Sequence, residues 1–265
     1  MLGPLNNRRA ALVVAHPGHE LRVFNWLRLA RPSVFVLTDG SGRTGESRLR
    51  KTTQILDQTG ARPGCIYGRF SDAEVYAAIL KHDLQRFMDV ASELATTLQN
   101  EQIDYVISDA VEGYNPAHDI CHLITSAVIE KLQRSGRRLK SFEVLLAHRN
   151  GNSLVPTPDS ISVQVSAEIL EEKLKAAKSY SELAFDVDQI LQQEGIEALR
   201  TEFMPAMKPF GSAQDTPTFY EAYGEKQVAC GYYCEVIRYR EHIVPIVEAL
   251  RNFARSQVEQ ATCES

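Results

Sequence analysis

The chain has 265 residues, of which 44% are hydrophobic and 24% are charged, and its formal net charge at pH 7 is −5. These values are typical of soluble globular proteins, and the acidic balance argues against a nucleic-acid partner or attachment to an anionic membrane. We find no run of about 20 apolar residues that predicts a membrane span, and no signal-peptide pattern at the N-terminus. Five scattered cysteines, an odd number, predict reduced thiols in a cytoplasmic protein.

The first 150 residues or so alternate between short apolar runs and longer amphipathic segments. The runs end at turn signals, which is the pattern of buried strands in a parallel sheet. We predict strands at 10–15, 34–38, 64–70, 103–108 and 142–146, and helices at about 21–31, 48–59, 72–95 (broken near 81–83) and 117–134. This alternation predicts an α/β fold with a Rossmann-like, mostly parallel sheet and helices on both faces.

The sequence is less regular from about residue 150 onward. Here we predict a loop at 150–159, an edge strand at 161–165, helices at 166–178 and 181–193, a long loop at 204–218, a tyrosine-rich segment without an assigned element at 219–240, and an amphipathic helix at 241–258. Neither an internal repeat nor a clear linker divides the chain. We therefore expect a single domain over residues 1–265.

Two histidine motifs follow predicted strands. His16 and His19 flank a Pro-Gly turn and precede Glu20, whereas His118 and His122 share one face of a helix. Ligands of open α/β sheets bind beyond the carboxyl ends of strands, and two imidazoles in one turn can bind one metal ion. That edge would gather His16, His19, Asp39, Asn115, His118 and His148. The alternative is that these are polar surface residues, and for His122 we expect an ordinary buried histidine.

The order and spacing of these motifs resemble the PIG-L/LmbE family of zinc-dependent N-acetylglucosaminyl deacetylases. The family motif A-H-P-D-D-E reads A-H-P-G-H-E at 15–20, and the later motif H-P-D-H reads N-P-A-H at 115–118. Between them lie a threonine-x-glycine turn at 38–40 and an early helix arginine, Arg48. The resemblance spans roughly the first 150 residues and implies an LmbE-like fold in a divergent member.

The resemblance also implies a metal centre. His16, His19 and His118 stand at the three ligand positions for zinc or another divalent transition metal, with His19 in place of an aspartate. Three neutral imidazoles with one open position suit catalytic zinc. Gly18 stands where the family has its general base, and glycine cannot transfer a proton. A relocated base would have to be Glu20, Asp39 or Asp119.

The remaining roles follow the same comparison. Asn115 replaces a histidine that polarises the substrate, and its amide can still donate a hydrogen bond to an oxyanion. Arg48 is a candidate for binding a polar substrate group, although a solvated helix arginine is an equal alternative. We expect a hydrolase in which metal-activated water attacks the amide of an N-acetylated amino sugar, a glycoconjugate or a related small molecule. Gly18 leaves a second hypothesis open, a non-catalytic protein that binds metal or a small ligand, and a homo-oligomer also stays open.

Overall fold

The computed structural model describes residues 5–42, 44–146, 157–180, 192, 195–212 and 217–256. A five-stranded sheet forms its centre, with every neighbouring pair parallel and the strand order β3-β2-β1-β4-β5. The strands are β1 (Ala10–Val14), β2 (Ser33–Thr38), β3 (Arg62–Phe70), β4 (Tyr105–Asp109) and β5 (Lys140–Val144). The predicted α/β class is confirmed, and each predicted strand is present with its ends shifted by one or two residues.

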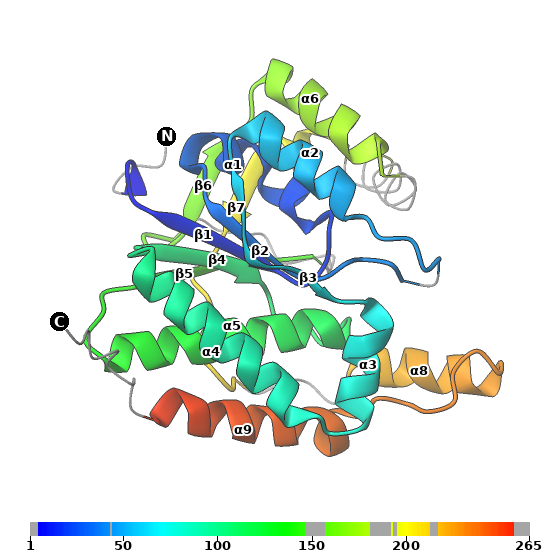
Figure 1. Cartoon of the computed structure of the whole chain (residues 1–265). Helices are drawn as coiled ribbons and strands as arrows, with labels where there is room; N and C mark the ends of the chain where they lie inside the picture. Colours follow the sequence, from blue (N-terminus) through cyan, green and yellow to red (C-terminus); the bar gives the residue numbers. More distant parts are fainter. Residues whose placement is uncertain are drawn as a thin grey trace.

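Helices cover both faces of this sheet (Figure 1). On one face lie α1 (Phe24–Ala30), α2 (Leu49–Thr59) and α6 (Ala167–Lys178), and on the other lie α3 (Asp72–Leu80), α4 (Leu84–Asn100), α5 (Pro116–Arg134) and α9 (Val244–Arg255). The first predicted helix is shorter than expected, because a 3₁₀-helix, η2 (His19–Val23), precedes α1. None of the described helices is long and apolar enough to cross a membrane.

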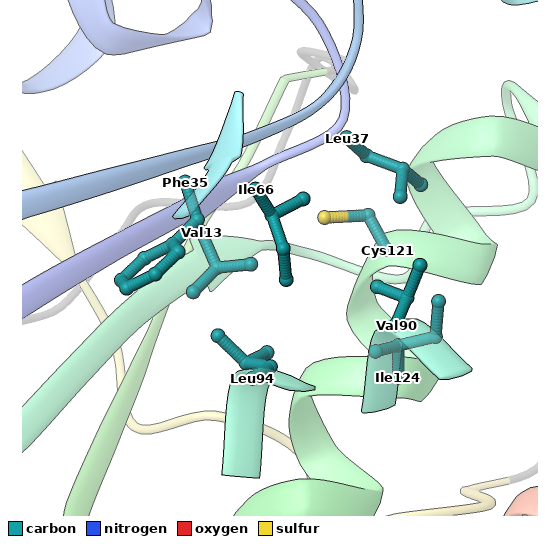
Figure 2. Close-up of a pocket in the computed structure, with 8 residues that line it drawn as sticks. All are labelled: Val13, Phe35, Leu37, Ile66, Val90, Leu94, Cys121 and Ile124. Carbon is teal, nitrogen blue, oxygen red and sulfur yellow. The ribbon is translucent and has the colours of Figure 1, made fainter. Parts of the chain in front are cut away.

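Two apolar cores follow from the alternation of side chains along the strands. Ala11 and Val13 of β1 belong to the core beneath α4, α5 and α9, whereas Leu12 and Val14 belong to the core beneath α1 and α2. Burial on both faces explains why β1 reads as a continuous apolar run. The first core contains an apolar cavity of about 10 Å³ beside Cys121 (Figure 2). It offers a water no polar partners, so it is a packing gap and not a binding site.

The second half of the chain adds a small antiparallel sheet of β6 (Ile161–Gln164) and β7 (Thr201–Met204). The strand β6 and the helix α6 were predicted, and Ser166 caps α6 by accepting a hydrogen bond from the amide of Ile169. Three elements were not predicted: β7, the 3₁₀-helix η3 (Ile196–Leu199) and the helix α8 (Phe219–Ala229). A short π-helix, η4 (Tyr239–Ile243), leads into α9. The predicted helix at 181–193 falls almost wholly outside the described residues.

Candidate functional site

Three histidines lie together at the carboxyl edge of the sheet. His16 follows β1, His19 begins η2, and His118 lies in the first turn of α5. The ring centroids are 5.3 Å apart for His16 and His19, 5.0 Å for His16 and His118, and 4.6 Å for His19 and His118. Imidazoles that share one tetrahedral zinc ion, bound at about 2.0–2.1 Å, have centroids roughly 5 Å apart. The spacing of this triangle therefore fits a shared ion.

Two buried carboxylates, those of Asp72 and Asp109, each contact the Nδ1 atom of one histidine in this triangle. The Nδ1 atom of His16 lies 2.9 Å from Oδ1 of Asp72 and 2.7 Å from Oγ1 of Thr38. The Nδ1 atom of His19 lies 2.9 Å from Oδ2 of Asp109. A carboxylate on one ring nitrogen is the usual outer partner of a metal-binding histidine, because it fixes the ring and its tautomer. In both rings Nε2 is the nitrogen that remains for a ligand.

Burial keeps two of the rings uncharged. Desolvation holds the pKa of His19 well below its usual value, and the nearby His16 lowers it further. The pKa of His118 is lowered for the same reasons, by burial first and then by His19. Burial also raises the pKa of Asp109 to about 6. Since neutral imidazole is the form that binds a metal, this environment favours ligation.

The donor atoms themselves are not yet gathered around one point. Among the residues that the structure describes, no group of three His, Cys, Asp or Glu side chains already has the arrangement of a metal site. The three rings nevertheless have the separations that one shared ion requires. The Oδ1 atom of Asp109 is also buried without a hydrogen-bond partner, as expected beside a site that takes a ligand. The donor set therefore fits zinc in kind and in the spacing of its rings.

The loop that carries His16 and His19 is held by a buried glutamate. Gly18 adopts φ 106°, in the left-handed region that favours glycine, and this turns the chain between the two histidines. The carboxylate of Glu20 accepts a hydrogen bond from the amide of Gly18 at 2.7 Å and another from the Tyr180 hydroxyl at 2.6 Å. Burial raises the pKa of Glu20. Both of its oxygens are thus engaged in shaping the loop.

Two other predicted residues, Asp39 and Arg48, lie in the segment between β2 and α2. Asp39 is half-buried directly after Thr38, and its Oδ1 accepts a hydrogen bond from the amide of Ser41 at 2.9 Å. Arg48 is also half-buried, and its Nε donates to the carbonyl of Gly40 at 2.5 Å. A Cβ atom at Gly40 would lie 2.8 Å from Cδ of Pro17 and 2.7 Å from Nε of Arg48, so Arg48 lies near the loop that carries His16 and His19.

Asn115 and Asp119 shape the start of α5. Asn115 is its N-cap, and its Oδ1 accepts from the amide of Ala117 at 2.8 Å. Asp119 is buried, and its Oδ1 accepts from the amides of Glu112 and Gly113 at 3.2 Å each. Asp119 therefore fastens the β4–α5 loop.

Of the other two predicted histidines, the structure describes His122 alone. His122 is fully buried with Nδ1 3.0 Å from the carbonyl oxygen of Asp109, and burial lowers its pKa to about 4. It matches the buried structural histidine expected from the sequence. His148 lies outside the described residues.

Sequence reasoning missed both outer carboxylates. Asp109 is the last residue of β4, and Asp72 begins α3 just beyond β3. Both stand at the carboxyl end of a strand, which is the signal that could have found them.

No protein-family model matches the sequence, and no curated protein matches it significantly. Among solved structures, the A40926 pseudoaglycone deacetylase Dbv21 aligns over its whole length with 78% of this chain, at 18% identity and a TM-score of 0.53. This chain shares that fold. A deacetylase of the teicoplanin biosynthesis pathway aligns over 94% of its length with 84% of this chain, at 14% identity and a TM-score of 0.48. The conserved protein TT1542 from Thermus thermophilus aligns over 98% of its length with 79% of this chain, at 16% identity and a TM-score of 0.47. At such identities the likeness concerns the fold alone, and the predicted fold class is confirmed.

Proposed function

We propose that this chain is a metal-dependent hydrolase that removes the acetyl group from an N-acetylated amino sugar, a glycoconjugate or a related small molecule. The main support is the triangle of imidazoles, two of which have lowered pKa values and two of which have a carboxylate at Nδ1. The fold shared with the deacetylase Dbv21 and the motif resemblance support the same reaction class.

In this proposal three histidines would hold the metal ion and two carboxylates would position the histidine rings. Zinc held by His16, His19 and His118 would supply Lewis acidity, which lowers the pKa of a bound water to about 7. Asp72 and Asp109 would hold two of the rings in place, as their contacts with Nδ1 suggest.

Asn115 and Arg48 would act on the substrate itself. The amide group of Asn115 has donors to offer to the oxyanion while Oδ1 stays on the helix N-terminus. Arg48 would bind a polar substrate group beside the loop.

The candidates for the general base differ in their surroundings. Glu20 has both oxygens engaged within the loop, and Asp119 fastens the β4–α5 loop. Asp39 is half-buried and follows Thr38, whose hydroxyl contacts His16. We therefore favour Asp39 as the base that replaces the missing side chain at Gly18. General-base assistance is typically worth about 10²–10⁴-fold in rate.

Metal content and acetate release together test this proposal. Purified protein loaded with zinc should retain one ion per chain and release acetate from N-acetylglucosamine. His118→Ala should lose both properties, whereas His82→Gln, a change at an exposed histidine between α3 and α4, should keep both. Asp39→Asn should keep the metal and lower kcat by about 10²–10⁴-fold. Wild-type protein that binds no zinc would overturn the proposal.

A second candidate function is binding without catalysis. The observations that favour it are Gly18 at the base position, in a backbone conformation that disfavours other residues, and donor atoms that are not yet gathered among the described residues. Gly18→Asp and Gly18→Asn impose the same backbone strain, but only aspartate supplies a base. Large acetate release by Gly18→Asp, over a silent wild type and a silent Gly18→Asn, would identify a binding protein that has lost its base.

A further inference from the structure

Four exposed aromatic side chains form a continuous row on one side of the molecule. Tyr114, Phe219, Tyr223 and Tyr233 are 49%, 50%, 39% and 36% exposed. Tyr114 stacks on Phe219 with centroids 4.8 Å apart, Phe219 stacks on Tyr223 at 6.0 Å, and Tyr223 meets Tyr233 edge-on at 6.5 Å. We call these residues the aromatic row. Adjoining exposed apolar side chains of this size usually mark a binding surface.

The row is joined directly to the candidate site. Tyr114 immediately precedes Asn115, the N-cap of α5, and His118 lies one helical turn further on. The amide of Phe219, at the start of α8, donates a hydrogen bond to the carbonyl of Gly113 at 2.9 Å. Figure 1 shows α8 projecting beyond α3 and the N-terminal end of α5. The row therefore begins at the loop that precedes His118 and leads away from it.

A tyrosine hydroxyl of α3 contacts Asn115, the residue that follows the first member of the row. Tyr76 of α3 donates a hydrogen bond to Oδ1 of Asn115 at 3.3 Å. Burial raises the pKa of Tyr76, and the charges of Tyr233, Asp72 and Tyr223 raise it further. The same helix begins at Asp72, which contacts His16. The helix α3 thus contacts both Asn115, next to the start of the row, and His16 of the triangle.

Two of the aromatic side chains of α8, Phe219 and Tyr223, are not used to build a core. Phe219 and Tyr223 are four residues apart and share the exposed face of the helix. The face that packs inward contains Tyr220 and Gly224, and a Cβ atom at position 224 would lie 3.1 Å from Cγ1 of Val236. The helix therefore packs through Tyr220 and Gly224 and exposes the rings of Phe219 and Tyr223 to solvent.

We propose that the aromatic row is a substrate subsite that binds an aromatic aglycone while the linked N-acetyl sugar reaches the three histidines. This inference rests on the proposed deacetylase function. The rings of Tyr114, Phe219 and Tyr223 lie nearly parallel, at 14° and 18° to one another, and their exposed surfaces are flat aromatic surfaces against which a further ring can pack. The tyrosine hydroxyls suit the polar substituents of such a ring. One stacked ring is worth about 2- to 13-fold in affinity.

Calorimetry with two glycosides tests the subsite. The probes are methyl and p-nitrophenyl N-acetyl-β-D-glucosaminide, which share the sugar and differ in the aromatic ring. Wild-type protein should bind the aryl glycoside about 2- to 13-fold more tightly than the methyl glycoside. Phe219→Ala with Tyr223→Ala should abolish this preference and leave the methyl glycoside unaffected. Tyr232→Ala is the matched control, because Tyr232 is 73% exposed on the same segment and shares none of the ring contacts of the row.

The outcomes separate the subsite from the proposed function. Equal affinity for the two glycosides, no measurable binding of either, or a preference that survives the double substitution overturns the subsite. Acetate release from the methyl glycoside tests the hydrolase alone. If the aryl glycoside is preferred only when the aromatic row is intact, and no acetate is released, the subsite is supported and the hydrolase proposal is rejected. Sedimentation covers the other possible occupant: if the double substitution dissociates a dimer and leaves the aryl preference intact, the row binds a second copy, and the subsite is rejected.

Discussion

Removal of one buried hydroxyl should loosen the loop that carries His16 and His19. In Tyr180→Phe, Glu20 keeps its bond to the amide of Gly18 and loses the 2.6 Å bond from the tyrosine. The hydroxyl of Thr52, 2.9 Å from the Tyr180 hydroxyl oxygen, also loses a partner. Hydrogen bonds to charged groups contribute about 1.5–3 kcal/mol, and the ring of Tyr180 still fills the same space. We therefore expect the free energy of unfolding to fall by about 1.5–3 kcal/mol.

Urea melts followed by tryptophan fluorescence measure this change. Trp26 is the single tryptophan and is fully buried, so its emission reports global unfolding. For a chain of this length the same loss lowers Tm by roughly 3–5 °C. Tyr67→Phe is the matched control, because its hydroxyl contacts Thr53 at 3.1 Å and no carboxylate. If Tyr180→Phe costs no more than Tyr67→Phe, the buried carboxylate does not hold the loop as we argue.

Three further predictions concern other parts of the molecule. Lys173→Met leaves the buried carboxylate of Glu202 without its 2.8 Å ion pair and should lower the free energy of unfolding by about 3–5 kcal/mol. Arg28→Ala breaks an exposed ion pair and should lower it by at most about 1 kcal/mol. Equal losses in urea melts would contradict this prediction. Because the pKa of His122 falls to about 4 on folding, the unfolded chain binds more protons between about pH 6.5 and 4, so stability should decline as the pH falls through that range by up to about 3 kcal/mol. His122→Gln should have a flatter stability profile, and identical profiles would refute the assignment. Gly40 has φ 68°, and Gly40→Ala places a Cβ atom 2.7 Å from Nε of Arg48, so this change should reduce both stability and substrate binding. Gly136 also has a positive φ but open space around it, so Gly136→Ala should reduce stability alone. Thermal melting and the KM of each variant distinguish the two outcomes.

The parallel sheet and its flanking helices were predictable because their signals are local. Buried strands such as β1 are apolar on both faces, and α2 ends at Gly60 with φ 74°, which is the usual glycine C-cap. The helix α8 was missed because Phe219 and Tyr223 face solvent and only Tyr220 among its large apolar side chains is buried, so no apolar stripe marks a helix. The strand β7 was missed because a four-residue strand at the edge of a two-stranded sheet carries little pattern of its own.

The candidate site was only partly predictable for a similar reason. The proximity of the three imidazoles followed from motifs at the carboxyl ends of β1 and β4. Their partners Asp72 and Asp109 lie 56 and 90 residues away from the rings they contact, so no sequence pattern joins them. The engagement of Glu20 by Tyr180, across 160 residues, depends on how α6 docks on the sheet.

The contact between Glu20 and Tyr180 also makes the two halves of the chain interdependent. A fragment that stops after β5 would contain the entire parallel sheet and all three histidines. It would lack Tyr180, whose hydroxyl donates a hydrogen bond to Glu20 in the loop that carries His16 and His19. In such a fragment the turn between His16 and His19 would lose this support, and the carboxylate of Glu20 would accept a hydrogen bond from water in place of Tyr180. The irregular second half, which contributes none of the three histidines, thereby sets the shape of the segment on which two of them stand.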